Sequence, residues 1–559
     1  MSEENTRLRK NTLSAEDSAA GDESASGRNL PARGRNLPAR ERNLPARGRV
    51  QEEEKPEKEK MDWIAMVVPL VGVAALSIVF MVSPAQSKML LTVVRSFLGD
   101  EAGLYYAILG CGILACSMYV AFSKYGKIRL GKNAVKEHSN FSWGVMIFTS
   151  TMAADILFYS LCEWSLYANE SYIVQTGNIQ KWSATYPLFH WGPIAWSFYI
   201  ILAVAFGFML HVRKRDKQKF SEACRPILKD RVDGVLGKVI DLIAIFALIA
   251  GTATTFSLAT PLLSEAVSKV FGMSNGIGLS IMILILIALV YTITVISGMK
   301  GIAKLASICS YLFFALLFYV LFLGGETRFV LESGFSSLGN MIQNFIGMST
   351  WMDPLRKNSF PQNWTIYYWA YWMVWCVATP FFIGKISKGR TVKETVLGGY
   401  GWGLAGTFTS FIILGNYGMA QQFKHGLDVS GFIEKGGDYS EAILKILGTL
   451  PVPYAAIILL VITMIAFYAT TFDALTMVIS SYSYKKLSAD AEPAKPVRIF
   501  WCIMFILLPI ALIFSENSMH SLQSVAIIAA FPIGIIVLLI VASFFRDAGE
   551  YIRERSKQL

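Results

Sequence analysis

The stretch Trp364-Thr-Ile-Tyr-Tyr-Trp-Ala-Tyr-Trp-Met-Val-Trp375 lies in a long apolar run and contains four tryptophans and three tyrosines. Spacings of four, three and four residues place one set on a single helix face: Tyr368, Trp372, Trp375 and Thr379. Aromatic rings on such a face attract a cation that cannot donate hydrogen bonds, such as a quaternary ammonium group. An aromatic belt at the membrane surface would explain Trp364, but not rings that continue three turns further. The stretch therefore favours a cation-binding box within a membrane span.

The composition of the whole chain is typical of a protein embedded in a membrane. Of its 559 residues, 54% are hydrophobic and 16% are charged, and the mean hydropathy is +0.46. A shorter apolar segment, 337–349, is expected to lie at the bilayer surface. Windows of about 20 apolar residues predict twelve spans, at residues 63–83, 103–123, 141–167, 189–212, 239–262, 276–298, 306–323, 364–384, 396–416, 454–480, 499–514 and 522–545. The chain is thus predicted to be an all-α polytopic membrane protein rather than a soluble domain.

Lysine and arginine are distributed unevenly between the predicted loops. The loops after even-numbered spans, with the C-terminal tail, carry 28 of them, whereas the loops after odd-numbered spans carry 10. By the positive-inside rule both termini are cytoplasmic. The net charge of +11 reflects this bias, so nucleic acid is not an expected partner. We expect a multi-pass protein of the plasma membrane, in contact with the lipid bilayer.

The two ends of the chain differ in composition from the predicted twelve-span membrane domain, residues 61–545. In residues 1–60 the sequence Arg28-Asn-Leu-Pro-Ala-Arg recurs at Arg35 and Arg42, and its proline excludes a heptad coiled coil. This segment is predicted to be disordered, either as a solvated tail or as a basic arm that touches anionic lipid or a regulatory partner. Residues 546–559 alternate in charge and are predicted to form a short cytoplasmic surface helix.

Three spans carry polar stretches at membrane depth: residues 149–155 in the third, 251–261 in the fifth and 467–473 in the tenth. Spans 3–7 and 8–12 form two blocks of five, about residues 141–323 and 364–545. Because five is odd, the blocks have opposite orientations, as in inverted-repeat secondary transporters, which bind substrate between discontinuous helices. The division alone is not specific, since any twelve-span chain can be cut in this way.

Several motifs resemble the betaine/choline/carnitine transporter family over about residues 60–548. The aromatic stretch with Ile386-Ser-Lys-Gly-Arg-Thr391 is similar to its signature, and three shorter matches accompany it: Leu188-Phe-His-Trp-Gly-Pro193, Phe158-Tyr159 and Gly251-Thr-Ala-Thr254. The resemblance implies a LeuT-like fold with 5+5 inverted repeats and two extra N-terminal helices. It also implies a homotrimer that carries trimethylammonium compounds.

The family's aromatic box implies six substrate-binding residues here: Trp191, Trp196, Tyr199, Tyr371, Trp372 and Trp375. The Ser257-Leu-Ala-Thr-Pro-Leu262 segment resembles the carnitine/butyrobetaine branch. That branch's exchangers fill the sodium site with an arginine where this chain has Cys309, and offer a methionine to the substrate where it has Thr379. Thr379 is thus a further candidate substrate contact, and both sodium-independent exchange and ion-coupled uptake stay open.

Hydroxyl groups in the tenth span predict a site for a hard monovalent cation. Thr470 and Thr471, with backbone carbonyls of an unwound third span near Thr151 and Met152, would supply oxygen ligands. The family's sodium site is built in this way, and Phe467 also falls on a matching position. The alternative is that these hydroxyls bond back to the preceding helical turn.

Asp155 is the sharpest single candidate, because a carboxylate at the centre of a span is costly and is by default a functional hypothesis. Choline-carrying relatives resemble this chain in having aspartate there. A negative charge beside the ammonium group favours choline, whereas a zwitterion would need a protonated Asp155, which makes proton coupling an alternative to sodium. The structural alternative is an aspartate paired across helices. Glu163 is expected to be a vestibule residue.

These features together predict a secondary transporter for a small quaternary ammonium compound such as choline, glycine betaine, carnitine or butyrobetaine. Uptake by alternating access would be coupled to Na⁺ or H⁺, and no resident cofactor is expected. A substrate sensor on the same scaffold would keep the aromatic box but lose the hydroxyls at Thr470 and Thr471. A channel would need a continuous polar stripe. An enzyme is disfavoured because the five histidines are scattered.

Overall fold

The computed structural model describes residues 60–131, 135–151, 154–296, 298–488, 491–514 and 519–558. The predicted tail up to residue 59 and the candidate ligand Met152 lie outside the described residues. Within the described ranges the chain is helical, and the isolated β-bridges are Met61 with Tyr484 and Arg129 with Thr391. The predicted all-α class is confirmed.

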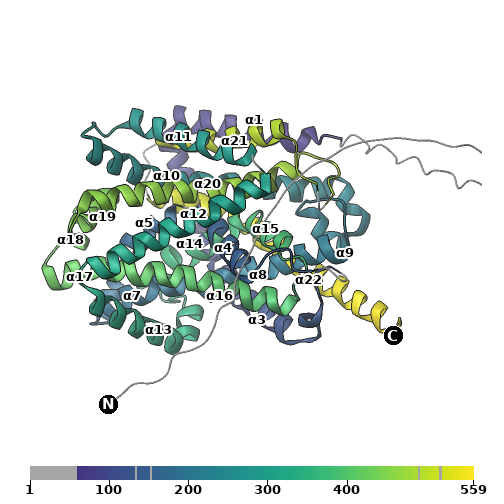
Figure 1. Ribbon diagram of the computed structural model, residues 1–559, viewed down its shortest axis with the longest axis horizontal. Coiled ribbons are helices and arrows are strands. Elements are labelled where there is room, and N and C mark those ends of the chain that lie inside the picture. Colours follow the sequence, from purple (N-terminus) through teal and green to yellow (C-terminus); the bar gives the residue numbers. More distant parts are fainter. Residues whose placement is uncertain are drawn as a thin grey trace, which may run out of the picture. The chain divides into compact units, whose positions relative to one another are not determined.

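The helices follow one another along the described chain with short connections (Figure 1). The α-helices of the first half are α1 (Trp63–Val82), α2 (Pro84–Ser96), α3 (Gly103–Phe122), α4 (Asn140–Thr151), α5 (Asp155–Ala168), α6 (Ser171–Gln175), α7 (Ile179–His190), α8 (Pro193–Gly207), α9 (Arg225–Leu228), α10 (Val235–Phe271), α11 (Ile277–Ile296) and α12 (Gly298–Phe318). Those of the second half are α13 (Thr327–Thr350), α14 (Ile366–Trp375), α15 (Thr379–Ile386), α16 (Val392–Ser410), α17 (Asn416–His425), α18 (Val429–Glu434), α19 (Tyr439–Leu447), α20 (Pro453–Ser481), α21 (Lys495–Phe514) and α22 (Met519–Ser556). Short 3₁₀ or π segments are η1 (Phe97–Glu101), η2 (Lys124–Lys127), η3 (Phe208–Val212), η4 (Ser221–Cys224), η5 (Lys229–Asp233), η6 (Tyr319–Leu323), η7 (Pro361–Thr365) and η8 (Phe411–Gly415).

Nine helices of the described chain are long and apolar enough to cross a membrane, and two bent pairs bring the number to eleven. Each predicted span falls on one of these, except 499–514, which lies in α21. The helix α21 begins with charged residues, Lys495 and Arg498, and its apolar part runs up to the undescribed residues after Phe514. The multi-span helical fold that the sequence predicts is therefore confirmed.

The two bent pairs occupy matching places in the predicted blocks. The axes of α4 and α5 differ by 65°, and the axes of the segments Pro361–Trp375 and Thr379–Ile386, which contain α14 and α15, differ by 54°. Each pair opens one block of five spans, so the helix that begins each half is broken. Broken helices at corresponding positions are the feature from which inverted-repeat transporters build their sites.

Helix contacts repeat between the two halves. The helix α4 packs against α12, as α14 packs against α22. The helix α4 also packs against α20 of the other half, as α14 packs against α10. Likewise α11 packs against α20, and α21 packs against α10. Because exchanging the halves preserves this pattern, the arrangement is that of two structural repeats, spanning Asn140–Leu323 and the chain from Ile366 on.

Glycines on one face of α16 allow close helix packing around the centre of the bundle. A Cβ atom on Gly403 would lie 2.5 Å from the ring of Trp196, and one on Gly406 would lie 2.1 Å from the ring of Phe148. These positions bring α16 against α8 and α4. On another face of the same helix, a Cβ on Gly401 would meet nothing within 4 Å.

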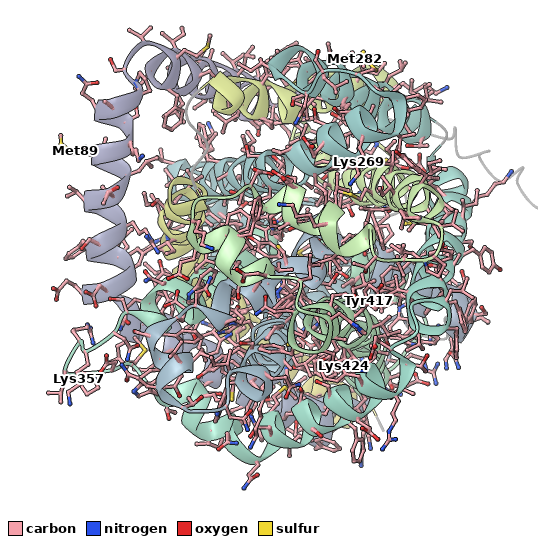
Figure 2. All side chains as sticks on the ribbon, turned by 90° about the vertical axis from the view of Figure 1, so that its left-hand side faces the viewer. Met89, Lys269, Met282, Lys357, Tyr417 and Lys424 are labelled. Carbon is pink, nitrogen blue, oxygen red and sulfur yellow. The ribbon has the colours of Figure 1, made fainter. Side chains whose placement is uncertain are left out.

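Apolar side chains cover the outside of several helices. In the helix α1 the Trp63 side chain is 65% exposed, and α2 exposes Met89, which Figure 2 shows at the edge of the molecule. The predicted surface segment 337–349 lies within α13, which exposes Phe335 and Ile342. Exposed apolar surface on this scale suits a protein surrounded by lipid.

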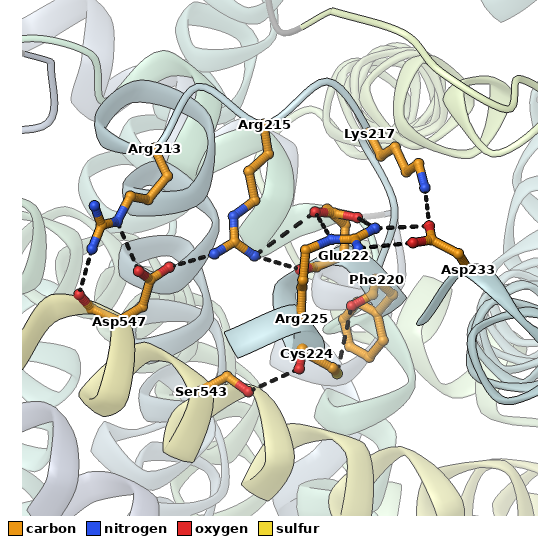
Figure 3. Close-up of polar contacts among 10 residues, drawn as sticks. All are labelled: Arg213, Arg215, Lys217, Phe220, Glu222, Cys224, Arg225, Asp233, Ser543 and Asp547. Carbon is orange, nitrogen blue, oxygen red and sulfur yellow. Dashed lines mark hydrogen bonds and ion pairs between the residues drawn. The ribbon is translucent and has the colours of Figure 1, made fainter. Parts of the chain in front are cut away.

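Ion pairs join the C-terminal end of α22 to the loop that follows α8 (Figure 3). Arg213 Nε and Arg215 Nη2 lie 2.7 and 2.6 Å from the two carboxylate oxygens of Asp547. In the same region Arg225 donates to Glu222 and Asp233. Hydrogen bonds from Arg225 and then from Lys217 hold the pKa of the Asp233 carboxyl well below its usual range.

Residues 546–559 are predicted to form a short surface helix, and the structure shows most of them as the end of a longer helix. These residues continue α22 without a break to Ser556. The last proline of the helix is Pro532, far upstream, and the pairing of Asp547 with Arg213 and Arg215 fixes the segment in place.

Candidate substrate and ion sites

Local sequence explains why three helix junctions meet at the centre of the bundle. Pro380 stands in the first turn of α15, where its missing N–H costs little, and it cannot continue α14. Gly192-Pro193 separates α7 from α8 and leaves Trp191 at the junction. Asp155 is the first residue of α5, just after the break from α4. Because the helices end at these junctions, side chains beside them can point in directions that a continuous helix would not allow.

A small cavity lies between these junctions. Its lining is Thr151, Asp155, Trp191, Tyr199, Tyr371, Trp372 and Trp375. About 20 Å³ of it is open to the centre of a water-sized sphere, which is room for about one water. Six of the eight predicted substrate residues therefore meet around one space, together with Thr151 from the predicted ion site.

The aromatic rings of this cavity contact one another around Trp372. Its ring centroid lies 4.7 Å from that of Tyr199 and 5.7 Å from that of Trp191. The ring of Trp196 lies 5.3 Å from Trp372 but does not line the cavity. Tilted and edge-on contacts at these separations are the favourable aromatic geometries. The structure thus places Trp196 behind the box, as a support for Trp372 and Tyr199.

Asp155 is the acidic group of the cavity and is 3% exposed. The hydroxyl of Tyr371 donates to its Oδ2 atom. The hydroxyl of Thr255 lies 3.4 Å from the same oxygen and 2.5 Å from the Tyr371 hydroxyl. As the first residue of α5, the carboxylate also lies at the positive end of that helix dipole. Hydroxyl donors and a helix N-terminus favour its ionised form, whereas its burial favours the protonated form.

Thr255 is a residue of this site that the sequence did not single out. It belongs to the polar stretch 251–261 of α10. The composition of this stretch indicated a polar site at membrane depth, but it did not indicate which of its residues would lie there. Thr379, in contrast, is predicted to touch substrate, but it does not line the cavity. It is buried in α15, and among the described residues its Oγ1 atom has no hydrogen-bond partner.

The predicted ion-binding residues divide into two groups. The Thr471 hydroxyl of α20 lies 3.4 Å from the carbonyl oxygen of Thr149 in α4, so it reaches the broken helix. The Thr470 hydroxyl instead lies 3.1 Å from the carbonyl oxygens of Ala466 and Phe467 in its own helix. Thr470 therefore adopts the back-bonding alternative, whereas Thr471 points at the neighbouring backbone.

The other predicted ion ligands lie around this contact. The Thr151 hydroxyl bonds to carbonyl oxygens of its own helix, 2.8 Å from Ile147 and 2.9 Å from Phe148. The side chain of Phe467 packs against the rings of Phe148 and Phe313. Met152 lies outside the described residues. The oxygen atoms that α4 and α20 bring together are hydroxyl and carbonyl oxygens, which are ligands that suit a sodium ion.

Glu163 does not lie in a vestibule, and the expectation that it would is wrong. Its side chain is fully buried in α5, two turns beyond Asp155. The Trp191 indole N–H donates to its Oε2 atom at 2.8 Å. Glu163 therefore contacts the back of the aromatic box through Trp191. Its position near the end of an apolar run did not predict this contact.

Comparisons with known proteins identify the family to which this chain belongs. The model of the betaine/carnitine/choline family transporters matches residues 64–553. Among curated proteins, the glycine betaine transporter OpuD of Bacillus subtilis (strain 168) is 30% identical over 506 residues, which cover 89% of this chain and 95% of that protein. A carnitine transporter of Acinetobacter baumannii is 28% identical over 426 residues, 75% of this chain and 76% of that one.

A solved structure of a Na⁺-coupled sialic acid symporter, in a substrate-bound outward-open state, is similar over 79% of this chain and 86% of that one. At 15% identity and a TM-score of 0.39, this likeness is too distant to bear on function. The family model, in contrast, covers nearly all of the described chain, including both broken helices and the aromatic box. The chain belongs to the betaine/carnitine/choline transporter family, whose members are transporters and not enzymes.

Proposed function

We propose that this protein carries a small trimethylammonium compound into the cell by ion-coupled alternating access. The observation that carries the proposal is one cavity in which five aromatic residues from α8, α14 and the α7–α8 junction surround the carboxylate of Asp155. Rings supply cation–π attraction of ~0.5–2 kcal/mol each. Several weak contacts suit a carrier, which must release what it binds.

The carboxylate supports choline as the preferred substrate. An ionised Asp155 adds attraction to the ammonium group and repels the carboxylate that glycine betaine, carnitine and butyrobetaine carry. The similarity to glycine betaine and carnitine transporters keeps these zwitterions as alternative substrates. They would be carried if Asp155 were protonated.

The size of the cavity supports a moving mechanism. A trimethylammonium group does not fit into a space for about one water, so the rings must separate before substrate enters. The breaks at α4–α5 and α14–α15 are the places where such a movement would occur. A closed site between two repeats is a state that alternating access requires.

The coupling ion is sodium or a proton. The contact between Thr471 and the backbone of α4 supports a sodium site, and the buried acids of α5 support a proton. Sodium-independent exchange is the alternative mechanism, and a substrate sensor is the alternative class. We further propose that the protein is a homotrimer in the plasma membrane, with both termini cytoplasmic.

Uptake into proteoliposomes tests this proposal. Radiolabelled choline, glycine betaine, carnitine and γ-butyrobetaine are offered separately, each with an inward sodium gradient, an inward proton gradient or neither. We expect gradient-driven uptake, with choline preferred and the preference shifted towards glycine betaine in Asp155→Gly. Uptake that needs only preloaded substrate would show substrate exchange rather than ion coupling. Binding without uptake under any condition would support the alternative class, a substrate sensor.

A further inference from the structure

Behind the aromatic cavity, Glu163 begins a chain of hydrogen bonds between buried side chains. The Tyr167 hydroxyl lies 2.6 Å from Glu163 Oε1 and 2.7 Å from His190 Nδ1. The opposite ring nitrogen of His190, Nε2, lies 3.0 Å from the Thr365 hydroxyl. The other carboxylate oxygen of Glu163 accepts from the Trp191 indole, whose ring lines the cavity. The chain thus runs from the box through α5 and α7 to the segment before α14.

The hydrogen bonds to the Glu163 carboxylate come from the neutral side chains of Tyr167 and Trp191. One cation, the buried Arg95 guanidinium of α2, acts electrostatically on Tyr367 of the same cluster. The titratable groups that face Glu163 come from α5 itself, from α7 and from α14, and Asp438 approaches Cys162 from the start of α19. These groups are Tyr159, Cys162, Tyr167, His190, Tyr367 and Tyr368. A fully buried carboxylate without a directly bonded cation is costly, which favours a protonated Glu163 when the box is empty.

The hydrogen bonds of the chain suggest a position for that proton. The oxygen bonded to the Trp191 indole accepts, because an indole N–H is a donor only, so we place the proton of neutral Glu163 on Oε1, where the Tyr167 oxygen can accept it. Glu163 then donates to Tyr167, Tyr167 donates to His190 Nδ1, and His190 donates from Nε2 to Thr365. When Glu163 is ionised every bond reverses, with Thr365 donating to His190 and Tyr167 donating to the carboxylate. The two arrangements differ by one proton and by the tautomer of His190.

We propose that Glu163 is a proton-binding site linked to the substrate cavity, which releases its proton through Tyr167 and His190 when a cation enters the aromatic box. This inference rests on the proposed function, because it needs a cationic substrate. A positive charge in a low-dielectric site stabilises a nearby carboxylate, so a cation beside Trp191 favours ionised Glu163. In each release, the Glu163 proton moves to Tyr167, the Tyr167 proton moves to His190 Nδ1, and the Nε2 proton moves to Thr365, which passes its own hydroxyl proton to solvent water.

Linkage is reciprocal, so the proton must weaken cation binding by the same factor. Asp155 and Glu163 then have different roles on one helix. Asp155 lies at the N-terminus of α5 with hydroxyl donors and pairs with the ammonium group directly. Glu163 acts through Trp191 as a positioning residue, and it balances the charge of whatever occupies the box.

Proton release on binding tests the linkage with the full-length protein in lipid nanodiscs. The probe is tetramethylammonium chloride, which carries a fixed charge and has no group to titrate, and a pH dye in weakly buffered solution counts protons. We expect about one proton released per bound cation in the wild type, and an affinity that rises by up to about tenfold per pH unit. Glu163→Gln should bind the cation with no release and no pH slope, and Glu163→Asp should restore both.

Two further variants separate the sources of a released proton. Glu170 accepts an indole N–H from Trp364 at 2.6 Å but does not line the cavity, so Glu170→Gln is a matched control that should release protons like the wild type. Asp155→Asn should weaken binding and still release a proton at saturation. Thermal unfolding and size-exclusion profiles verify that each variant is folded.

The possible outcomes distinguish a failure of the proton linkage from a failure of the proposed transport function. If Glu163→Gln releases as many protons as the wild type, or if Asp155→Asn alone abolishes release, the linkage is wrong and the proposed transport is unaffected. If the wild type binds neither tetramethylammonium nor any of the four trimethylammonium compounds at any pH, the proposed function fails, and the linkage fails with it.

Discussion

Trp372 has the largest share of the contacts in the aromatic box, since its ring meets those of Trp191, Trp196 and Tyr199. Its neighbours come from α8 and from the α7–α8 junction, whereas Trp372 itself belongs to α14. One side chain thus joins a helix of the first repeat to the broken helix of the second. A change at this residue should alter both the affinity of the site and the contact between repeats.

Truncation of Trp372 tests the first of these effects. Trp372→Ala removes one ring of the box and its contacts, and the loss of ~0.5–2 kcal/mol in cation–π attraction corresponds to an affinity about two- to thirty-fold lower. Trp372→Phe keeps a ring and should lose less. Equilibrium binding of radiolabelled choline measures both. Equal affinities for the alanine variant and the wild type would remove Trp372 from the binding surface.

The two threonines of α20 offer a matched pair for the ion site. The Thr471 hydroxyl contacts the carbonyl oxygen of Thr149 in the neighbouring helix α4, whereas the Thr470 hydroxyl bonds to its own helix. If sodium is the coupling ion, Thr471→Ala should raise the sodium concentration for half-maximal uptake several-fold, and Thr470→Ala should change it little. A larger effect at Thr470 than at Thr471 would argue against this division.

At the scale of elements, α16 packs against Trp196 behind the aromatic box but does not line the cavity itself. The close approach of Gly403 to Trp196 holds that ring against Trp372 and Tyr199. The sequence revealed the aromatic helix and the polar stretches, because each rests on residue types at helical spacing. It did not reveal this glycine contact or the burial of Glu163, since both depend on which helices become neighbours after folding.

Gly403→Ala is therefore expected to act at a distance. Its Cβ would need space already occupied by the Trp196 ring, and overpacking of this kind costs about 1–3 kcal/mol. We expect a lower unfolding temperature and weaker choline binding. Gly401→Ala, on an open face of the same helix, is the control and should resemble the wild type. Identical behaviour of the two variants would show that α16 does not support the box.

At the scale of the whole molecule, the two repeats could be predicted from the sequence, whereas the ion pairs at the end of α22 could not. Opposite orientations of the two blocks followed from counting spans, and the break in the third span was predicted near Thr151, whereas the break before Pro380 in the eighth span was not predicted. The ion pairs of Arg213 and Arg215 with Asp547 join segments more than 300 residues apart. Alternating charges alone could not identify these partners, since each charge had many candidates of opposite sign.

Removing the charge of Asp547 should loosen the end of α22. Asp547→Asn leaves two half-buried arginines without their shared partner, and a hydrogen bond to a charged group contributes about 1.5–3 kcal/mol. Hydrogen exchange of residues 544–556 should accelerate, more so at low salt. Glu554, which pairs with Arg213 but is 57% exposed, gives the control: Glu554→Gln should have little effect. Equal protection in both variants would contradict the assigned role of Asp547.

The closed cavity has a consequence for the cell as well as for the substrate. With space for about one water between its rings, the described part of this cavity is a narrow constriction, and narrow constrictions lined largely by apolar side chains resist wetting. If the protein is ion-coupled as we propose, this constriction limits leakage of the coupling ion between transport cycles. The aromatic side chains that we propose to bind the cation would then also form a barrier to other ions.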